Sequence, residues 1–316
     1  MRVNKFLLVV VIFAPLMNPL LICIGQVSLR ADLVLVPVSV RDKQGRAVTD
    51  LRADDFKLFD NGQPQRIVFF SSEQESDQLA RPLELVLLLD SSRSISAILH
   101  QQRTAVTSLL NQLGEKTFVS LISFSRHPNV ILDFTNQKER ALTAFLQHQR
   151  LEGDTAIFDA VLFGLKQLSE RPQDETRKIV IIISDGQDTA STIGFRQCLE
   201  LAHEHGIAVY SILIPIYSPY GDRLVARRPV KGFRELAEET GGKFFQVGTV
   251  EAALNPSATI DLGPIFTAIV EDVRHQYYLG FYPPENNQPG FHRLDVRVTK
   301  KHTKVELKRR GYIARP

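Results

Sequence analysis

The sequence contains little cysteine, and this limits what can hold the fold together. Among 316 residues, only Cys23 and Cys198 are cysteines. Cys23 lies in an N-terminal segment with the features of a removable signal. After cleavage Cys198 would have no partner, so no intramolecular disulfide could form even in an oxidising compartment. Cys198 falls in the helical pattern FRQCLELAH of residues 195–203, where we expect a buried structural thiol. Stability must therefore come from a hydrophobic core.

The chain also lacks a strong net charge, a zinc motif and a serine-nucleophile motif. The formal charge of +3 is too small to imply nucleic-acid binding. His203 and His205 are two residues apart and would lie on different faces of a helix, unlike the four-residue spacing of zinc proteases. No GxSxG elbow surrounds the SSRS of residues 91–94. We therefore expect no catalytic residues and no enzymatic activity. The enzymatic alternative is a hydrolase in which a metal polarises the substrate.

The first 25 residues have the pattern of an export signal. Arg2 and Lys5 precede an apolar run over residues 6–24. We expect cleavage after Gly25, with the mature protein periplasmic, secreted or associated with the cell envelope. Retention as a membrane anchor is one alternative, and lipid modification at Cys23 is another.

Three polar clusters point to a metal site. They are DSSRS at 90–94, GDT at 153–155 and SDGQD at 184–188, and the first and third follow the apolar runs at 84–89 and 178–183. Both runs predict buried parallel strands, whose carboxyl ends meet at one edge of a sheet. The clusters offer carboxylates and hydroxyls but no thiolate or imidazole. Such an all-oxygen set favours Mg²⁺ or Mn²⁺.

This combination of DxSxS, a distant threonine and a later DG resembles the von Willebrand factor type A domain and its metal-ion-dependent adhesion site. The resemblance covers roughly residues 84–275. It implies direct or water-mediated metal ligands at Asp90, Ser92, Ser94, Thr155 and Asp185. Asp188 is expected either behind the metal as a hydrogen-bond acceptor or in a solvated loop. One alternative is a degenerate domain that keeps these positions without binding metal, and another is that Ser92 or Ser94 caps the following helix.

The same resemblance implies an α/β fold. It predicts a Rossmann-like, doubly wound sheet of six mostly parallel strands with helices on both faces. Before it, valines alternate over residues 34–40, and a hairpin is predicted from 56–59 and 66–70 around the turn at 60–64, where Asn61 and Gly62 can adopt positive φ. We expect these strands to pair with C-terminal strands in a small β-module. The predicted division is 1–25 signal, 26–75 N-terminal strands, 76–83 linker, 84–275 α/β domain and 276–316 C-terminal strands.

The flanking segments, including RRGYIA at 309–314, are similar to exported bacterial proteins of this family. The resemblance implies a binding protein whose cation keeps a coordination position for an Asp or Glu carboxylate of a protein partner. The alternative is a structural or assembly component of the envelope in which the metal only braces loops. The basic segment 293–315 could contact a membrane or another anionic surface, or could be the solvated face of a hairpin. The loop 217–228 is either a recognition loop or a solvated insertion.

Overall fold

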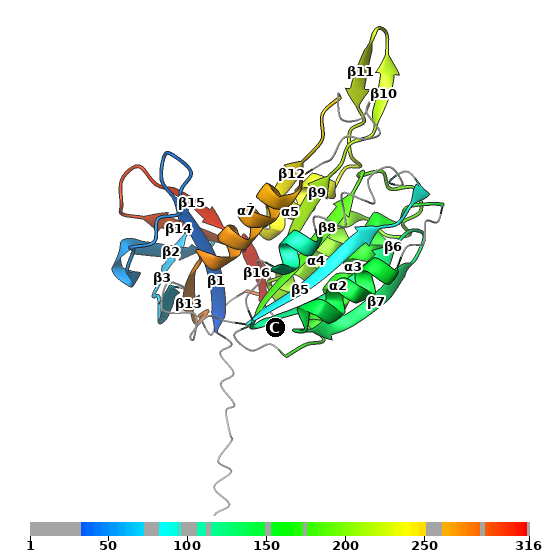
Figure 1. Ribbon diagram of the computed structural model, residues 1–316. Helices are drawn as coiled ribbons and strands as arrows, with labels where there is room; N and C mark the ends of the chain where they lie inside the picture. Colours follow the sequence, from blue (N-terminus) through cyan, green and yellow to red (C-terminus); the bar gives the residue numbers. More distant parts are fainter. Residues whose placement is uncertain are drawn as a thin grey trace, which may run out of the picture. The chain divides into compact units, whose positions relative to one another are not determined.

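The computed structural model describes residues 33–72, 82–93, 95, 106–111, 115–148, 153–172, 176–250, 261–284 and 288–314. The predicted signal at 1–25 and Ser94 lie outside these residues. Within the described ranges, no helix is both long enough and apolar enough to span a membrane. An α/β part and a β part can be distinguished, coloured along the chain in Figure 1.

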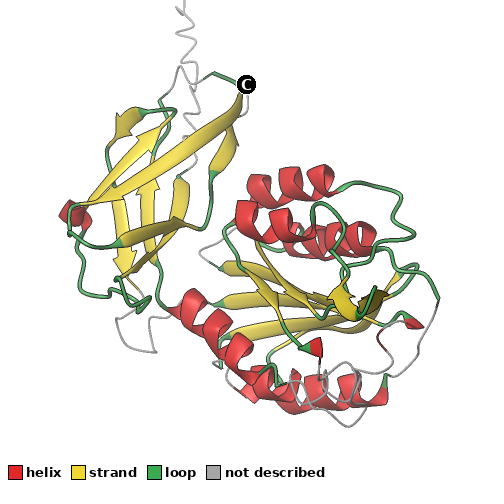
Figure 2. Ribbon diagram, turned by 90° about the horizontal axis from the view of Figure 1, so that it is seen from above, coloured by secondary structure: helices red, strands yellow, loops and turns green. Residues whose placement is uncertain are grey.

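The predicted α/β fold is confirmed. Its six-stranded sheet has the order β12-β9-β8-β5-β6-β7, and neighbouring strands are parallel except β7, which runs antiparallel to β6. The strands are β5 (Leu83–Asp90), β6 (Thr117–Phe124), β7 (Pro128–Thr135), β8 (Arg177–Ser184), β9 (Ala208–Leu213) and β12 (Phe244–Gln246). The helices are α2 (Lys138–Gln147), α3 (Ile157–Ser169), α4 (Phe195–His205), α5 (Phe233–Thr240) and α7 (Gly263–Arg274). Figure 2 shows helices on both faces of this sheet.

Strand β5 lies inside the sheet because its side chains are apolar toward both faces. Leu85 and Leu87 pack on the side of α2 and α7, whereas Val86 and Leu88 pack on the side of α3, α4 and α5. Successive side chains of a strand point to opposite faces, so a continuous apolar run suits a strand that is covered on both sides. The chain continues from β5 to β6 on one side and later to β8 on the other. The carboxyl end of β5 is therefore the position where such sheets bind ligands.

The predicted pairing of N-terminal with C-terminal strands is also confirmed. Two antiparallel sheets have the orders β15-β1-β13-β4 and β16-β14-β2-β3. Their strands are β1 (Val34–Arg41), β2 (Phe56–Asp60), β3 (Gln63–Gln65), β4 (Phe69–Ser72), β13 (Tyr277–Phe281), β14 (Gly290–Val298), β15 (Lys304–Leu307) and β16 (Gly311–Ala314). One core lies between them and includes the alternating valines of β1. We call this part the β-sandwich. The exact domain boundaries stay a prediction.

One detail of the predicted hairpin is wrong. Asn61 and Gly62 do have positive φ, at 45° and 82°. The returning strand, however, is only β3, and β4 pairs with β13 in the other sheet. The sequence between them therefore crosses from one sheet to the other, which the apolar pattern of residues 66–70 does not reveal.

The basic residues of the C-terminal strands lie largely on a solvated face. Buried and exposed residues alternate along β14 from His292 to Arg297. Several of the exposed cations have acidic partners, namely Arg297 with Asp295, Lys300 with Asp50 and Lys304 with Glu306. This pattern agrees with the outer face of a packed sheet. Contact with a membrane or anionic surface stays a prediction.

A buried carboxylate on α7 joins the β-sandwich to the α/β part. Asp272 accepts hydrogen bonds from Arg41 Nη2 at 2.8 Å, Lys308 Nζ at 2.7 Å and Tyr210 Oη at 2.9 Å, and from Lys243. Arg41 lies in β1 and Lys308 follows β15, whereas Tyr210 lies in β9 and Lys243 directly precedes β12. We call these five residues the Asp272 cluster.

Asp272 should make the stability of the protein depend on pH. Burial alone would raise the pKa of Asp272, but the charges of Lys308 and Lys243 and their hydrogen bonds outweigh burial and hold the pKa well below its usual range. A carboxyl group with a lowered folded-state pKa contributes stability above its unfolded pKa of about 4, and this contribution is lost as the pH falls below that value. We expect the wild type to lose more stability between pH 5 and pH 3 than Asp272→Asn, as measured by urea unfolding. Equal losses in the two proteins would contradict this role.

Candidate functional site

Asp90 is fixed at the carboxyl end of β5. It is the last residue of the strand and is 1% exposed. Its Oδ1 accepts the backbone N–H of Ser92 at 2.8 Å, and its Oδ2 accepts the hydroxyl of Ser184 at 2.6 Å. The Ser92 hydroxyl also hydrogen-bonds to Asp90. The carboxylate is therefore held between its own loop and the last residue of the neighbouring strand β8.

Asp185 lies beside it, directly after β8. It is 2% exposed, and its Oδ1 accepts the N–H of Gln187 at 2.9 Å. Its Oδ2 is buried and has no hydrogen-bond partner among the described residues. A buried carboxylate oxygen without a partner is costly, so each such atom needs an explanation. A bound cation would satisfy it.

The electrostatics of this pair also fit a cation. Burial raises the pKa of Asp90 to about 6, and the negative charge of Asp185 adds to the rise, while hydrogen bonds from Ser184 and Ser92 act against it. Two carboxylates buried close to one another repel when both are ionised. A divalent cation between them would remove this repulsion and favour the charged form of each.

Thr155 belongs to a loop at the same edge of the sheet. It is 4% exposed, and its N–H donates to Thr189 Oγ1 at 3.0 Å. The next residue, Ala156, donates its N–H at 2.8 Å to the carbonyl of Ser125, directly after β6. These hydrogen bonds hold the Thr155 loop between the end of β6 and the loop that follows Asp185. The structure places Asp90, Ser92, Thr155 and Asp185 at one rim, and Ser94 lies outside the described residues.

Asp188 has a structural role at the start of α3. Its Oδ1 accepts the N–H of Ile157 at 2.7 Å and the hydroxyl of Ser191 at 2.6 Å. It is therefore an acceptor rather than a freely solvated side chain, and it stabilises the N-terminus of the helix that follows Thr155.

Sequence reasoning did not single out Ser184, although it lies in the SDGQD cluster. Its hydroxyl donates to Asp90 and accepts the N–H of Gly186 at 3.0 Å. The signal was its position directly after the strand predicted at 178–183, beside the end of β5.

The residue types at this rim fit a hard divalent cation. The side chains are carboxylates and neutral hydroxyls, which are the ligands that Mg²⁺ and Mn²⁺ prefer.

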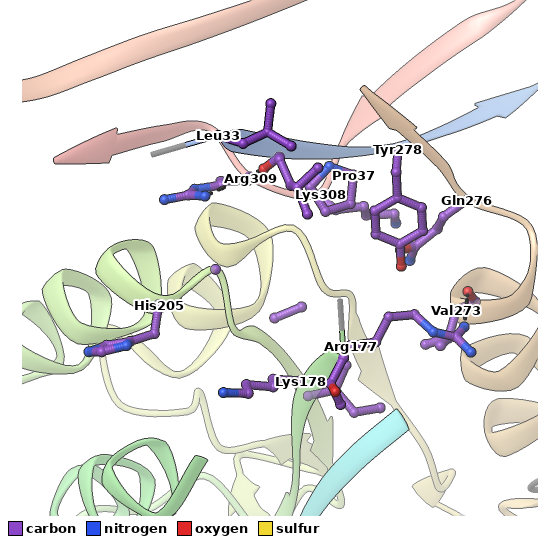
Figure 3. A pocket seen from close by; sticks show the side chains of 15 residues that line it. Leu33, Pro37, Arg177, Lys178, His205, Val273, Gln276, Tyr278, Lys308 and Arg309 are labelled. Atoms are coloured by element: carbon purple, nitrogen blue, oxygen red, sulfur yellow. Dashed lines mark hydrogen bonds between the residues drawn. The ribbon is translucent and has the colours of Figure 1, made fainter. Parts of the chain in front are cut away.

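A separate cavity of about 180 Å³ lies at the opposite edge of the sheet, by the start of β8 (Figure 3). Arg177, Lys178 and Arg309, which line it, donate to backbone carbonyls at or just past the C-terminal ends of α7, α3 and α4, at 2.7, 3.0 and 3.2 Å. Burial lowers the pKa of Arg309 to about 10, which leaves it charged at neutral pH. Cations at helix C-termini are stabilising. Helix capping therefore accounts for the three cations that line this cavity.

The α/β part of the chain is similar to a known family. The family model of the von Willebrand factor type A domain matches residues 84–257. The search of curated proteins finds no match.

Three solved structures illustrate the similarity. BatB from Bacteroides thetaiotaomicron, described as a conserved hypothetical protein, is 19% identical, with a TM-score of 0.48 over 60% of this chain and 97% of that one. A von Willebrand factor type A protein from Catenulispora acidiphila is 10% identical, with a TM-score of 0.49 over 89% and 73%. Proximal thread matrix protein 1 from the mussel byssus, with zinc in its MIDAS motif, is 16% identical, with a TM-score of 0.48 over 64% and 47%.

Proposed function

The chain belongs to the von Willebrand factor type A family, and on that premise we propose that it is a metal-dependent protein-binding protein rather than an enzyme. Domains of this family are in general interaction modules that bind a divalent metal at the adhesion site. In this chain the cation is Mg²⁺ or Mn²⁺, and the partner offers an Asp or Glu carboxylate. The observation that carries the proposal is the buried, unpartnered Oδ2 of Asp185 next to the buried carboxylate of Asp90.

The chain prepares this site in several ways. Asp90, Ser92, Ser94, Thr155 and Asp185 would hold the cation directly or through water. The amide and hydroxyl donors of Ser92 and Ser184 orient Asp90, and the amide of Gln187 orients Asp185. The cation supplies a positive charge that an incoming carboxylate can bind. The other proposed metal ligands are neutral hydroxyls, so the chain itself supplies no third negative charge to the cation.

We further propose that the protein acts outside the cytoplasm. The support is the basic start and apolar run of residues 1–25, which lie outside the described residues. An exported location would place the rim that carries Asp90 and Asp185, here called the metal rim, where it can bind partners in the periplasm, at the envelope or outside the cell.

Asp185→Ala tests the metal site. In calorimetric titrations with Mn²⁺ or Mg²⁺, we expect the variant to bind the metal about 100-fold more weakly than the wild type. Losses up to this size are seen even for residues that only hydrogen-bond to a metal ligand, and Asp185 would be a ligand itself. Without metal the variant should be at least as stable as the wild type, because it no longer buries an unpartnered carboxylate. Added Mg²⁺ should then raise the melting temperature of the wild type only.

The matched control is Asp295→Ala, which removes an exposed carboxylate from β14. It should bind metal like the wild type. A wild-type protein that shows no binding of Mg²⁺ or Mn²⁺, or an Asp185→Ala variant with unchanged affinity, would refute the proposal. Metal that stabilises the fold without changing the binding of carboxylate-containing peptides would instead favour a bracing role for the metal in an envelope component.

A further inference from the structure

The segment that the sequence left as a recognition loop or insertion forms a hairpin. Its strands are β10 (Tyr217–Tyr220) and β11 (Arg223–Ala226), which pair only with each other among the described strands. The hairpin connects β9 to α5, so it starts from the same edge of the sheet as Asp90 and Asp185. Figure 1 shows it extending beyond the end of β9.

Both stems of the hairpin are attached to residues 184–188, at and directly after the end of β8. Three hydrogen bonds make the attachment: Ile214 N to Ser184 O at 2.9 Å, Val230 N to Gly186 O at 2.8 Å, and Gln187 Nε2 to Arg228 O at 3.0 Å. Gly186 is also enclosed, because a Cβ there would lie 2.7 Å from Leu213 and from Pro229. The base of the hairpin therefore has a fixed position next to Asp185.

The hairpin presents one coherent exposed face. The register places Tyr220 opposite Arg223 and Ser218 opposite Val225, and residues directly opposite one another share a face. Arg227 continues on this face, where its Nε donates to Ser218 Oγ at 2.6 Å. We call these five residues the Tyr220 face. Tyr220 is 71% exposed and Val225 43%, so the face combines apolar surface with two guanidinium groups.

The charge around the hairpin is strongly positive. Residues 217–231 contain one acid, Asp222, and four basic residues, which are Arg223, Arg227, Arg228 and Lys231. The described residues provide no ion-pair partner for any of the four. Some cations elsewhere on the surface do have such partners, as in the pairs of Lys300 and Arg297. Unpaired charges of one sign beside a binding site attract a ligand of the opposite sign.

We infer that the Tyr220 face is a second contact surface for the partner, which binds an acidic segment flanking the carboxylate that reaches the metal rim. This inference rests on the proposed function. One carboxylate would meet the cation, while neighbouring acidic side chains meet Arg223 and Arg227 and an apolar side chain packs on Tyr220. The metal site thus requires a carboxylate, and the hairpin selects the sequence around it. Tyr and Arg are among the residue types that most often contribute strongly at protein interfaces.

The test uses the full chain and two fluorescent twelve-residue peptides in anisotropy titrations. One peptide carries a single Glu in a Gly-Ser sequence, and the other carries the same Glu flanked by further Glu residues and one Leu. For the double variant with Arg223→Glu and Arg227→Glu, we expect about tenfold weaker binding of the acidic peptide, more at low ionic strength, because exposed charges act over about a Debye length. Tyr220→Ala should weaken binding of the same peptide. Binding of the single-Glu peptide and of Mn²⁺ should not change.

The matched controls lie on the β-sandwich. Lys57→Glu with Lys301→Glu makes the same change in charge, and Tyr282→Ala removes a tyrosine that is 53% exposed. Both should bind the acidic peptide like the wild type. If EDTA abolishes binding but the hairpin variants bind normally, the inference fails and the proposed function stands. If the hairpin variants weaken binding that EDTA and Asp185→Ala leave unchanged, the hairpin contact stands and the metal-dependent function fails.

Two further outcomes would overturn the inference. One is that the wild type binds neither peptide more tightly than a fourfold variant does. This variant combines the control changes Lys57→Glu and Lys301→Glu with Arg223→Glu and Arg227→Glu. The other is that the Tyr220 face proves to bind phosphatidylglycerol vesicles, with loss in Tyr220→Ala, while the acidic peptide does not compete. That result would assign the face to a membrane surface.

Discussion

Replacing Asp272 with alanine is expected to lower the free energy of unfolding by about 3–5 kcal/mol, the usual cost of removing one partner from a buried ion pair. The side chain of Asp272 is fully buried, and that of Lys308 is only 4% exposed. Without the carboxylate, Lys308 keeps a buried charge with no counter-ion at hydrogen-bond distance, and Tyr210 loses the acceptor of its hydroxyl. Because these groups belong to different parts of the fold, the loss should weaken the attachment of the β-sandwich to α7.

Urea unfolding at pH 7 measures the effect. Glu238→Ala is the control, because Glu238 pairs with Arg234 on the surface with both side chains about half exposed. That change should alter the stability by less than about 0.5 kcal/mol. A loss of similar size in the two variants would show that the Asp272 cluster does not stabilise the native state in the way its geometry indicates.

The central strands could be predicted from the sequence because their pattern is local. The apolar runs at 84–89 and 178–183 are buried on both faces, and β5 and β8 lie there. Strand β7 and helix α2 were not predicted. Both lie at one side of the sheet. They contain more exposed residues than the central strands do, so their apolar pattern is weak. The partner of β4 could not be predicted either, since β13 is some 200 residues away in the chain and pairing at such a distance leaves no local signal.

The candidate site likewise contains features that could be predicted from the sequence and features that could not. Asp90 and Asp185 could be placed together because each follows a predicted parallel strand, and the carboxyl ends of such strands share an edge. The capping role of Asp188 depends on α3 lying within hydrogen-bond distance, which the sequence does not specify. The Asp272 cluster was not predicted at all. Its members come from five separate segments, and only the folded chain brings the cations to the carboxylate.

Gly241→Ala is expected to be the second large loss, roughly 3–5 kcal/mol, which exceeds the ordinary cost of overpacking because the obstacle is backbone. Gly241 ends α5 with φ at 87°, a conformation that favours glycine. A methyl group there would also overlap the carbonyl and Cα of Lys308. The segment of Lys308 would have to move, and its N–H bond to Pro37 O at 2.8 Å and its ion pair with Asp272 would both be disturbed.

Gly45→Ala separates the two causes of this loss. Gly45 has a similar φ of 80°, but a Cβ there meets no atom within 4 Å, so the change should cost only about 1 kcal/mol from backbone conformation. Comparing the urea unfolding of Gly45→Ala with that of Gly241→Ala isolates the overlap with Lys308.

Combining Gly241→Ala with Asp272→Ala adds a sharper criterion. If the methyl group acts by displacing Lys308 from Asp272, the double variant should lose clearly less than the sum of the single losses, since the second change removes an interaction already broken. Full additivity would mean that the two residues stabilise the attachment of the β-sandwich independently.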